Sequence, residues 1–436
     1  MFEDVFQHLL GPDWIIVKEG FQVVFKWLGE FIKIWWWVAL PFIFYYLFRK
    51  VYLWRLKKQW GRQQKAKILQ IKMPEEVKRP MKAMEQVFSH LWSLYSSPDF
   101  KDKWLEGKGY PQFSVEIASR AGKISFFIRY PEGLGDTIKS IFYSQYPDLE
   151  LQSVNDYTKN VPQKIPGNNW SMWGAEIKST RDDFYPIKTY QQFFEQVPET
   201  REEKKIDPLF SLLEGLTKLK KGEELWIQLV CTPITEKENN WVSRGKERID
   251  EITKIIKKGQ KKSILRRAFD EFFFGISSGE PVESDSQEDR KKISYPLEKE
   301  MEAIHEKISK SGFEVYLRTI YLGKDEVFFK PRVTIPINFF TGLSTENLNG
   351  FRPSGKTSVD FSWFKKKRVY IKSRAFFDQY IKRARPGFPQ ADNSFVLNPE
   401  ELATIFHFPS KGGIISTNFE RIQSKKSRPP TNLPTE

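Results

Sequence analysis

The chain has little of the two residue types that build most metal sites and disulfides. It contains one cysteine, Cys231, and four histidines in 436 residues. A single cysteine excludes an intramolecular disulfide and any site with several cysteine ligands. The histidines lie far apart in sequence, so a zinc site has little to form from. We therefore expect no metal and no cofactor, and we interpret Cys231 as a small apolar residue in a buried strand.

Acidic residues are outnumbered. The 55 aspartates and glutamates stand against 70 lysines and arginines, which gives a net charge of +15. A basic protein favours anionic partners, and the two classes to consider are nucleic acid and an anionic membrane surface.

Apolar runs without charge are also scarce, and the one at residues 34–48 reads IWWWVALPFIFYYLF. Phe31 and Ile32 extend it, because the intervening Lys33 can snorkel to the interface. The resulting length is near the lower limit for one membrane-spanning helix. Tryptophans near one end and tyrosines near the other suit the two interfacial belts. The run therefore predicts a transmembrane helix, with a buried helix of a soluble domain as the alternative.

Basic residues follow this run, whereas acids and lysines are mixed before it. The residues are Arg49, Lys50, Arg55, Lys57, Lys58 and Arg62. The positive-inside rule then places the chain after residue 50 in the cytoplasm. We predict a single-pass protein of the cytoplasmic membrane, with an amphipathic segment at 1–33 outside, the span and its basic flank at 34–64, and the bulk of the chain in the cytoplasm.

The rest of the chain has the pattern of an α+β protein. Residues 65–165 alternate strand and helix signals in the order β-α-β-β-α-β, the ferredoxin-like arrangement, with a tight hairpin at residues 120–122. Further α/β sandwich-type units are expected after it. The predicted segments are a second α/β unit with a long basic helix at 166–274, a flexible acidic linker at 275–293, a third α/β unit at 294–410 and a tail at 411–436.

The stretch GFRPSGKT matches the G-x-x-x-x-G-K-[ST] pattern of phosphate-binding loops through Gly350, Gly355, Lys356 and Thr357. Such a loop joins the end of a buried strand to the start of a helix. Here the upstream sequence is polar and rich in turn residues, and residues 358–371 alternate like a strand or hairpin. We therefore expect no nucleotide site and no enzyme, and a nucleotide hydrolase is the lesser alternative.

Basic and aromatic residues interleave at residues 363–388. Cations for phosphates and rings for bases are typical of a single-stranded or nonspecific DNA surface, and the alternative is a solvated face or a patch that docks an acidic partner. The predicted contact residues are Lys365, Lys366, Lys367, Arg368, Lys372, Arg374, Lys382, Arg383 and Arg385. The rings predicted to stack on bases are those of Phe376, Phe377 and Tyr380.

Four stretches resemble a known group of proteins. They are YPIKTYQQF at 185–193, DPLFSLLEGLTKLKKGEELWIQLVCTPI at 207–234, FVLNPEELATIFHFPS at 395–410 and RIQSKKSRPPTNLP at 421–434. Together they resemble the N-terminal region of large membrane-anchored proteins of Patescibacteria-like bacteria. In those proteins a C-terminal motor of the HerA/FtsK type follows, similar to the ATPases of conjugation and type IV secretion.

The resemblance implies that this chain corresponds to the membrane-proximal half of such proteins without the motor. It implies a non-enzymatic accessory or docking component of a conjugation or type IV secretion-like apparatus for DNA or protein transfer, in a bacterial membrane. The implied partners are the membrane, a HerA/FtsK-type motor ATPase in trans, further copies of the chain and, as a further candidate, DNA. No catalytic residue carries over. The alternative function is a nucleic-acid-binding membrane protein.

Overall fold

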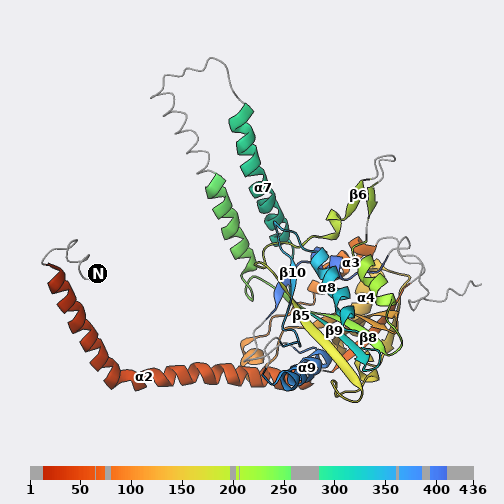
Figure 1. Ribbon diagram of the computed structural model, residues 1–436, viewed down its shortest axis with the longest axis horizontal. Helices are drawn as coiled ribbons and strands as arrows, with labels where there is room; N and C mark the ends of the chain where they lie inside the picture. Colours follow the sequence, from red (N-terminus) through yellow and green to blue (C-terminus); the bar gives the residue numbers. More distant parts are fainter. Residues whose placement is uncertain are drawn as a thin grey trace, which may run out of the picture. The chain divides into compact units, whose positions relative to one another are not determined.

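The computed structural model describes residues 13–63, 65–73, 80–196, 203–205, 207–256, 284–359, 363–384 and 393–409 (Figure 1). It divides into two compact units. The helical unit comprises residues 1–63 and 98–109, and the sheet unit comprises residues 64–97 and 110–436.

The helical unit consists of the long helix α2 (Asp13–Gln63) and a short π-helix, η1 (Asp102–Glu106). The Arg49 guanidinium lies 5.0 Å from the ring centroid of Trp104, and the Tyr52 hydroxyl donates a 3.3 Å hydrogen bond to the Trp104 carbonyl. Gly107, at φ 66°, ends η1 so close to α2 that a Cβ would lie 2.5 Å from the backbone of Leu56. Only glycine fits this approach.

In the described part of the chain, no single helix is long and apolar enough to cross a membrane. Two segments of α2, Gln22–Phe31 and Trp36–Leu56, meet the criterion together, with a 58° bend between them. The bend is visible in Figure 1. Most of the predicted transmembrane run at residues 34–48 lies in the second segment, and the span stays a prediction.

Within the described residues of the sheet unit, nine strands form one antiparallel sheet in the order β10-β5-β9-β8-β2-β3-β1-β4, with β11 paired to β9. The strands are β1 (Ala66–Lys72), β2 (Phe113–Arg120), β3 (Lys123–Pro131), β4 (Glu150–Val154), β5 (Trp170–Ser179), β8 (Glu223–Ile234), β9 (Gly312–Lys324), β10 (Phe351–Ser354) and β11 (Phe395–Leu397). Strands β6 (Phe194–Gln196) and β7 (Glu203–Lys205) pair separately.

Helices accompany this antiparallel sheet, so the protein has the mixed helix and sheet class that the sequence predicted. The helices come from both halves of the chain. They are α3 (Pro80–Trp92), α4 (Gly135–Gln145), α5 (Phe210–Thr217), α7 (Ser284–Ile308), α8 (Thr334–Gly342), α9 (Lys365–Lys382) and α10 (Pro399–Ile405). Short 3₁₀ turns are η2 (Glu132–Leu134), η3 (Tyr157–Asn160), η4 (Tyr190–Gln192) and η5 (Lys330–Val333).

The first half of the sheet has the element order predicted for residues 65–165. Its elements run β1-α3-β2-β3-α4-β4, and its strands lie in the order β4-β1-β3-β2. The hairpin between β2 and β3 turns at Ala121 (φ 51°) and Gly122 (φ 82°). Two consecutive positive φ angles are the mark of a type I′ turn, whose twist matches that of the flanking strands.

The second half repeats this arrangement. Its elements run β5-α5-β8-β9-α8-β10, and its strands lie in the order β10-β5-β9-β8. The halves join where β2 pairs with β8, from Phe113 opposite Cys231 to Arg120 opposite Glu224. The units expected at residues 65–165, 166–274 and 294–410 therefore contribute strands to one continuous sheet. Sequence periodicity misses this because strand pairing is non-local.

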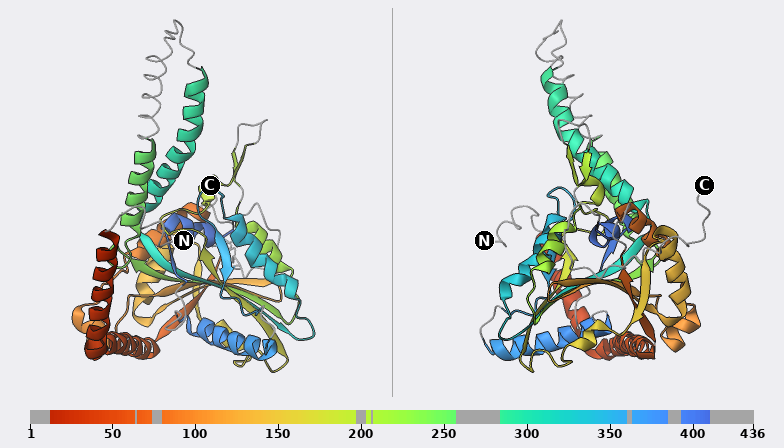
Figure 2. Two further views of the ribbon diagram at one scale, coloured as in Figure 1. Left: turned by 60° about the vertical axis from the view of Figure 1, so that its left-hand side comes forward. Right: turned by 90° about the vertical axis from the view of Figure 1, so that its right-hand side faces the viewer.

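The β8–β9 connection differs from the tight β2–β3 turn, because a helix at residues 241–256 and α7 are inserted there. Figure 2 shows the two helices side by side, and the ion pair of Arg248 with Glu300 joins them at 3.1 Å. Residues 284–293, predicted as flexible linker, instead begin α7. The predicted linker is acidic and rich in serine, but it also contains residues of good helix propensity, such as glutamate, glutamine and lysine. Residues 257–283 lie outside the described residues.

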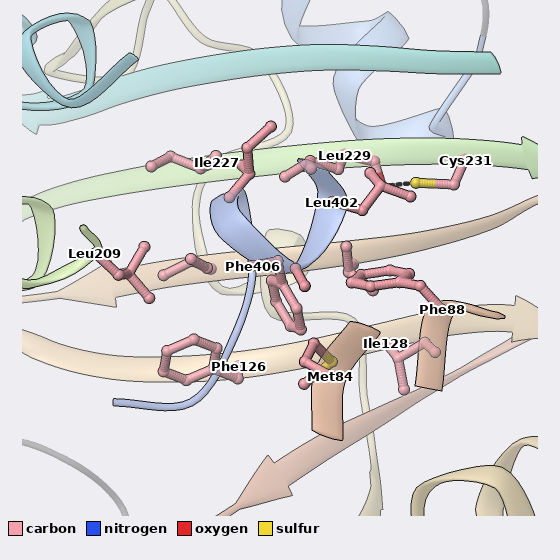
Figure 3. Packing of buried hydrophobic residues seen from close by; sticks show 14 of the residues in the cluster. Met84, Phe88, Phe126, Ile128, Leu209, Ile227, Leu229, Cys231, Leu402 and Phe406 are labelled. Atoms are coloured by element: carbon pink, nitrogen blue, oxygen red, sulfur yellow. Dashed lines mark hydrogen bonds between the residues drawn. The ribbon is translucent and has the colours of Figure 1, made fainter. Parts of the chain in front are cut away.

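Apolar side chains fill both faces of the sheet. One cluster packs under α3, α4, α5 and α10, and a smaller one packs under α9. Figure 3 shows Leu402 and Phe406 from the α10 region among residues of β8 and β3. Phe88 of α3 is fully buried and meets the rings of Phe313 and Phe406 edge-on, at centroid distances of 6.5 and 6.4 Å.

The Phe88→Ala substitution is expected to lower the free energy of unfolding by about 3–5 kcal/mol, because it leaves a cavity between α3, β9 and α10. Urea unfolding of the full chain in detergent, followed by tryptophan fluorescence, measures the change. Phe329, which is 57% exposed, provides the control, since Phe329→Ala should change the unfolding free energy by less than about 0.5 kcal/mol. Equal effects of the two substitutions would contradict the packing described.

Candidate contact surface on helix α9

Helix α9 contains the basic and aromatic stretch and has two distinct faces. Its inner face buries Ser373, Phe376, Phe377 and Tyr380. The ring of Trp226, on β8, lies 6.4 Å from that of Phe377 and 5.7 Å from that of Tyr380. This three- and four-residue spacing fixes one side of the helix against the sheet.

Two predictions about this stretch are therefore wrong. Phe376, Phe377 and Tyr380 are core residues and not exposed stacking rings. The strand-like alternation at residues 358–371 is not realised either, because α9 begins at Lys365. Alternation of cations with single apolar residues imitates a strand, but the buried positions further along the chain impose the helical period.

The outer face of α9 presents most of the predicted cations. Lys365, Lys366, Lys367, Arg368, Lys372 and Lys382 are exposed, and Arg374 is half-buried. Arg374 lies over the ring of Tyr370 at 5.7 Å, and Lys382 pairs with Asp378 at 2.6 Å. Across the residues that the structure describes, Lys365, Lys366 and Lys367 have no ion-pair partner.

Large apolar side chains accompany these cations, and the sequence-based list of contact residues did not include them. Trp363 is 72% exposed, Phe364 77%, Ile371 57% and Tyr370 48%. We call the set formed by Trp363, Phe364, Lys365, Lys366, Lys367, Arg368, Tyr370, Ile371 and Lys372 the α9 patch. The helical spacing of the buried positions does not identify these residues, because Tyr370 falls on that spacing and Trp363 and Phe364 precede the helix.

Arg383 does not belong to this surface, which corrects its prediction as a contact residue. Its side chain is 1% exposed, and its Nε and Nη2 atoms each donate a 2.9 Å hydrogen bond to the Glu116 carboxylate. A second ion pair joins it to Asp156. Arg383 has φ 49° and ends α9, so the end of the helix is tied to β2. Arg385 lies outside the described residues.

Glu116 is fully buried, and several groups stabilise its charged form. Ser114 and Gln228 donate hydrogen bonds to its Oε1 at 2.7 and 3.1 Å. Burial by itself raises the pKa of Glu116, but the charge and hydrogen bonds of Arg383, together with the hydrogen bond from Ser114, lower the pKa to about 2. Burial and the charge of Arg383 lower the pKa of Arg129 nearby. This network was not predicted, because its members lie on β2, β3 and β8, just before η3 and at the end of α9.

The residues of the phosphate-loop pattern have a different structure from such a loop. Residues 351–354 form the edge strand β10, paired with β5. The Thr357 amide donates to the Gly174 carbonyl at 2.9 Å, and its hydroxyl accepts from the Gly174 amide at 3.0 Å. The Glu176 carboxylate lies beside Gly355, where an added Cβ would be 3.2 Å from Oε2. A carboxylate repels phosphate, and no helix starts directly after Thr357.

Other reactive groups in the described residues offer little chemistry. Cys231 is fully buried, and burial raises the pKa of its thiol. No group of three or more histidine, cysteine or acidic residues is arranged to hold a metal ion in the described ranges. The α9 patch is therefore the strongest candidate site on the sheet unit.

A protein-family model described as a domain of unknown function, DUF8128, matches residues 59–416. The chain belongs to the DUF8128 family. A comparison with curated proteins returned no match. The DUF8128 domain contains the whole nine-stranded sheet and α9, so the α9 patch lies within it. Most of α2 precedes the domain.

Arg383→Ala is expected to lower the unfolding free energy by about 3–5 kcal/mol, because it leaves the Glu116 carboxylate buried without its partner. Chemical unfolding in detergent measures this. Lys382→Ala at the next position removes an exposed ion pair with Asp378 and should change stability by about 0.5 kcal/mol or less.

The Arg383–Glu116 ion pair also predicts how the free energy of unfolding depends on pH. The pKa of Glu116 is lowered from 4.5 to about 2 in the folded state, so its stabilisation is fully present above pH 4.5 and is lost as pH falls toward 2. The stability difference between the native chain and Glu116→Gln should narrow over that interval. A difference independent of pH would contradict the charged state of Glu116.

Lys356→Ala is expected to leave both the fold and the nucleotide affinity of the chain unchanged, because Lys356 is exposed at the end of an edge strand. Isothermal titration with Mg-ATP should show no saturable heat for either protein. Micromolar binding that disappears in the variant would instead establish a phosphate-binding loop at residues 350–357.

Proposed function

We propose that the protein is a membrane-attached, non-enzymatic docking protein, in which α2 holds the chain at the bilayer and the sheet unit presents contact surfaces. The observation that carries this proposal is the apolar exposure along α2. Phe42 is 71% exposed, Phe44 63% and Phe48 66%. A contiguous apolar surface of this kind marks an interaction site, and its length and aromatic content suit lipid.

The bend in α2 defines how it would meet the bilayer. The segment Trp36–Leu56 is the more apolar half of the bent pair, and Gln22–Phe31 precedes it at 58°. We infer that the later segment enters the membrane as the predicted single pass, with the earlier one at the outer interface. Arg49, Lys50 and Arg55 follow the apolar run, which favours a cytoplasmic sheet unit.

The repeated β-α-β-β-α-β order supports the assignment of two ferredoxin-like units in the sheet unit. That fold hosts many functions, so the docking role rests on its surfaces. We propose that the unit acts in a conjugation or type IV secretion-like apparatus, as several copies bound to a separate motor ATPase of the HerA/FtsK type. The resemblance of residues 185–193, 207–234 and 395–410 to membrane-proximal halves of such proteins supports this proposal.

Attachment through α2 predicts that the paired substitutions Phe42→Lys and Phe44→Lys release the chain from membranes, because each central charge costs about 2.5–3.5 kcal/mol in a membrane-spanning helix. The native chain should stay in the pellet after alkaline carbonate extraction, and the variant should appear in the supernatant. Phe329→Lys, a charge added at an exposed phenylalanine of the sheet unit, is the control and should stay in the pellet.

Labelling in intact cells completes this test. An impermeant maleimide should react with Lys26→Cys and not with Lys237→Cys, and the buried Cys231 should give no background. Release of the native chain by carbonate would contradict attachment through a span, and labelling at position 237 alone would reverse its orientation.

A further inference from the structure

The N-terminal part of α9 combines charge and apolar exposure in a way that local stability does not explain. Four consecutive cations, Lys365 to Arg368, occupy its first turn, which has no acidic residue. Positive charge at a helix N-terminus opposes the helix dipole, and neighbouring like charges repel. Phe364, just before them, has φ 54° and provides no side-chain cap. An anionic partner would relieve this unfavourable arrangement.

Apolar side chains of the patch lie where such a partner would sit. Lys367, Ile371 and Arg374 follow one another at four- and three-residue steps in α9, so they share one side of the helix. Trp363 lies in the turn just before the helix. Trp363 and Ile371 are 72% and 57% exposed. The surface is therefore a mixture of cations and protruding apolar groups rather than a purely charged face.

We propose that the α9 patch binds the surface of an anionic lipid bilayer, with Lys365, Lys366 and Lys367 at the headgroup phosphates and Trp363 and Phe364 in the interface. This mode is that of an interfacial amphipathic helix, whose apolar side enters the boundary of headgroups and acyl chains. The inference deepens the proposed function, on which it rests, by adding a membrane contact on the DUF8128 domain itself.

A bilayer fits the patch better than nucleic acid does. The exposed rings of Trp363 and Phe364 suit either partner, because nucleic acid stacks bases on rings and a bilayer interface accepts aromatic side chains. The exposed Ile371 adds no stacking but gains from an acyl boundary. Tryptophan next to lysine is the composition of membrane interfaces.

The sheet presents the patch rigidly. The inner face of α9 is held by Phe376, Phe377 and Tyr380, and its C-terminal end by the Arg383–Glu116 pair. The helix therefore need not fold on contact, so no ordering cost reduces the affinity. The outer face can act as a preformed membrane contact.

The test uses the full chain in lipid nanodiscs, with a fluorescent label on Ile371→Cys. The native Cys231 is fully buried, so the introduced thiol reacts selectively. In discs containing phosphatidylglycerol, lipids brominated on their acyl chains should quench the label. Discs of phosphatidylcholine alone should give much weaker quenching.

Replacement of Lys365, Lys366 and Lys367 by glutamine should remove most of this quenching. Each cation near an anionic leaflet contributes about fivefold to the binding equilibrium, so three together contribute about 100-fold. The matched control replaces Lys218, Lys220 and Lys221, three exposed lysines that follow α5, by glutamine. The control should quench like the unsubstituted labelled chain.

The experiment distinguishes the lipid contact of the α9 patch from the attachment of the chain through α2. If α2 retains the chain in discs but the label is equally unquenched with both lipids, the lipid assignment of the α9 patch is wrong and the proposed attachment stands. Protection of the label by single-stranded DNA, without quenching by anionic lipid, would assign the patch to nucleic acid. If the chain is not retained in discs, attachment through α2 fails, and quenching by added anionic vesicles still decides the role of the patch.

Discussion

The pairing of β2 with β8 is the interaction on which the rest of the sheet unit depends. It joins residues 113–120 to residues 224–231 in register and makes one sheet from two repeated halves. Without it, each half would expose a long edge strand with unpaired backbone groups, which is a site for aggregation. When β2 and β8 pair, the strands at the two ends of the sheet order are the short strands β4 and β10.

The same pairing builds the buried polar network at the centre of the sheet. Glu116 and Gln228 lie directly opposite each other across the β2–β8 seam, and Arg383 reaches Glu116 from the end of α9. A buried ion pair adds little net stability, because desolvation offsets its attraction, but losing one partner is costly. Its structural effect is to fix where α9 ends, and thereby which side of the helix faces outward.

Two proposed membrane contacts would give the docking role a physical basis. Helix α2 supplies apolar length, and the α9 patch supplies charge with shallow apolar groups. Neither needs catalytic chemistry, and the pattern at residues 350–357 is built as an edge strand beside a carboxylate. The DUF8128 domain thus combines a rigid sheet with a surface suited to a charged, deformable partner.

The sequence by itself determined the local elements. The order of strands and helices in residues 65–165 could be predicted, because each segment shows the hydrophobic period of a strand or of a helix. α10 (Pro399–Ile405) has a local start signal, in which Asn398 and Glu401 cap each other's backbone amides at 2.9 Å. Only the tertiary structure decided that the halves share one sheet, that Phe376 and Arg383 are buried, and that Trp363 is exposed. These outcomes depend on contacts between residues more than 100 positions apart, such as Phe113 with Cys231 and Arg383 with Glu116, and no local pattern encodes such contacts.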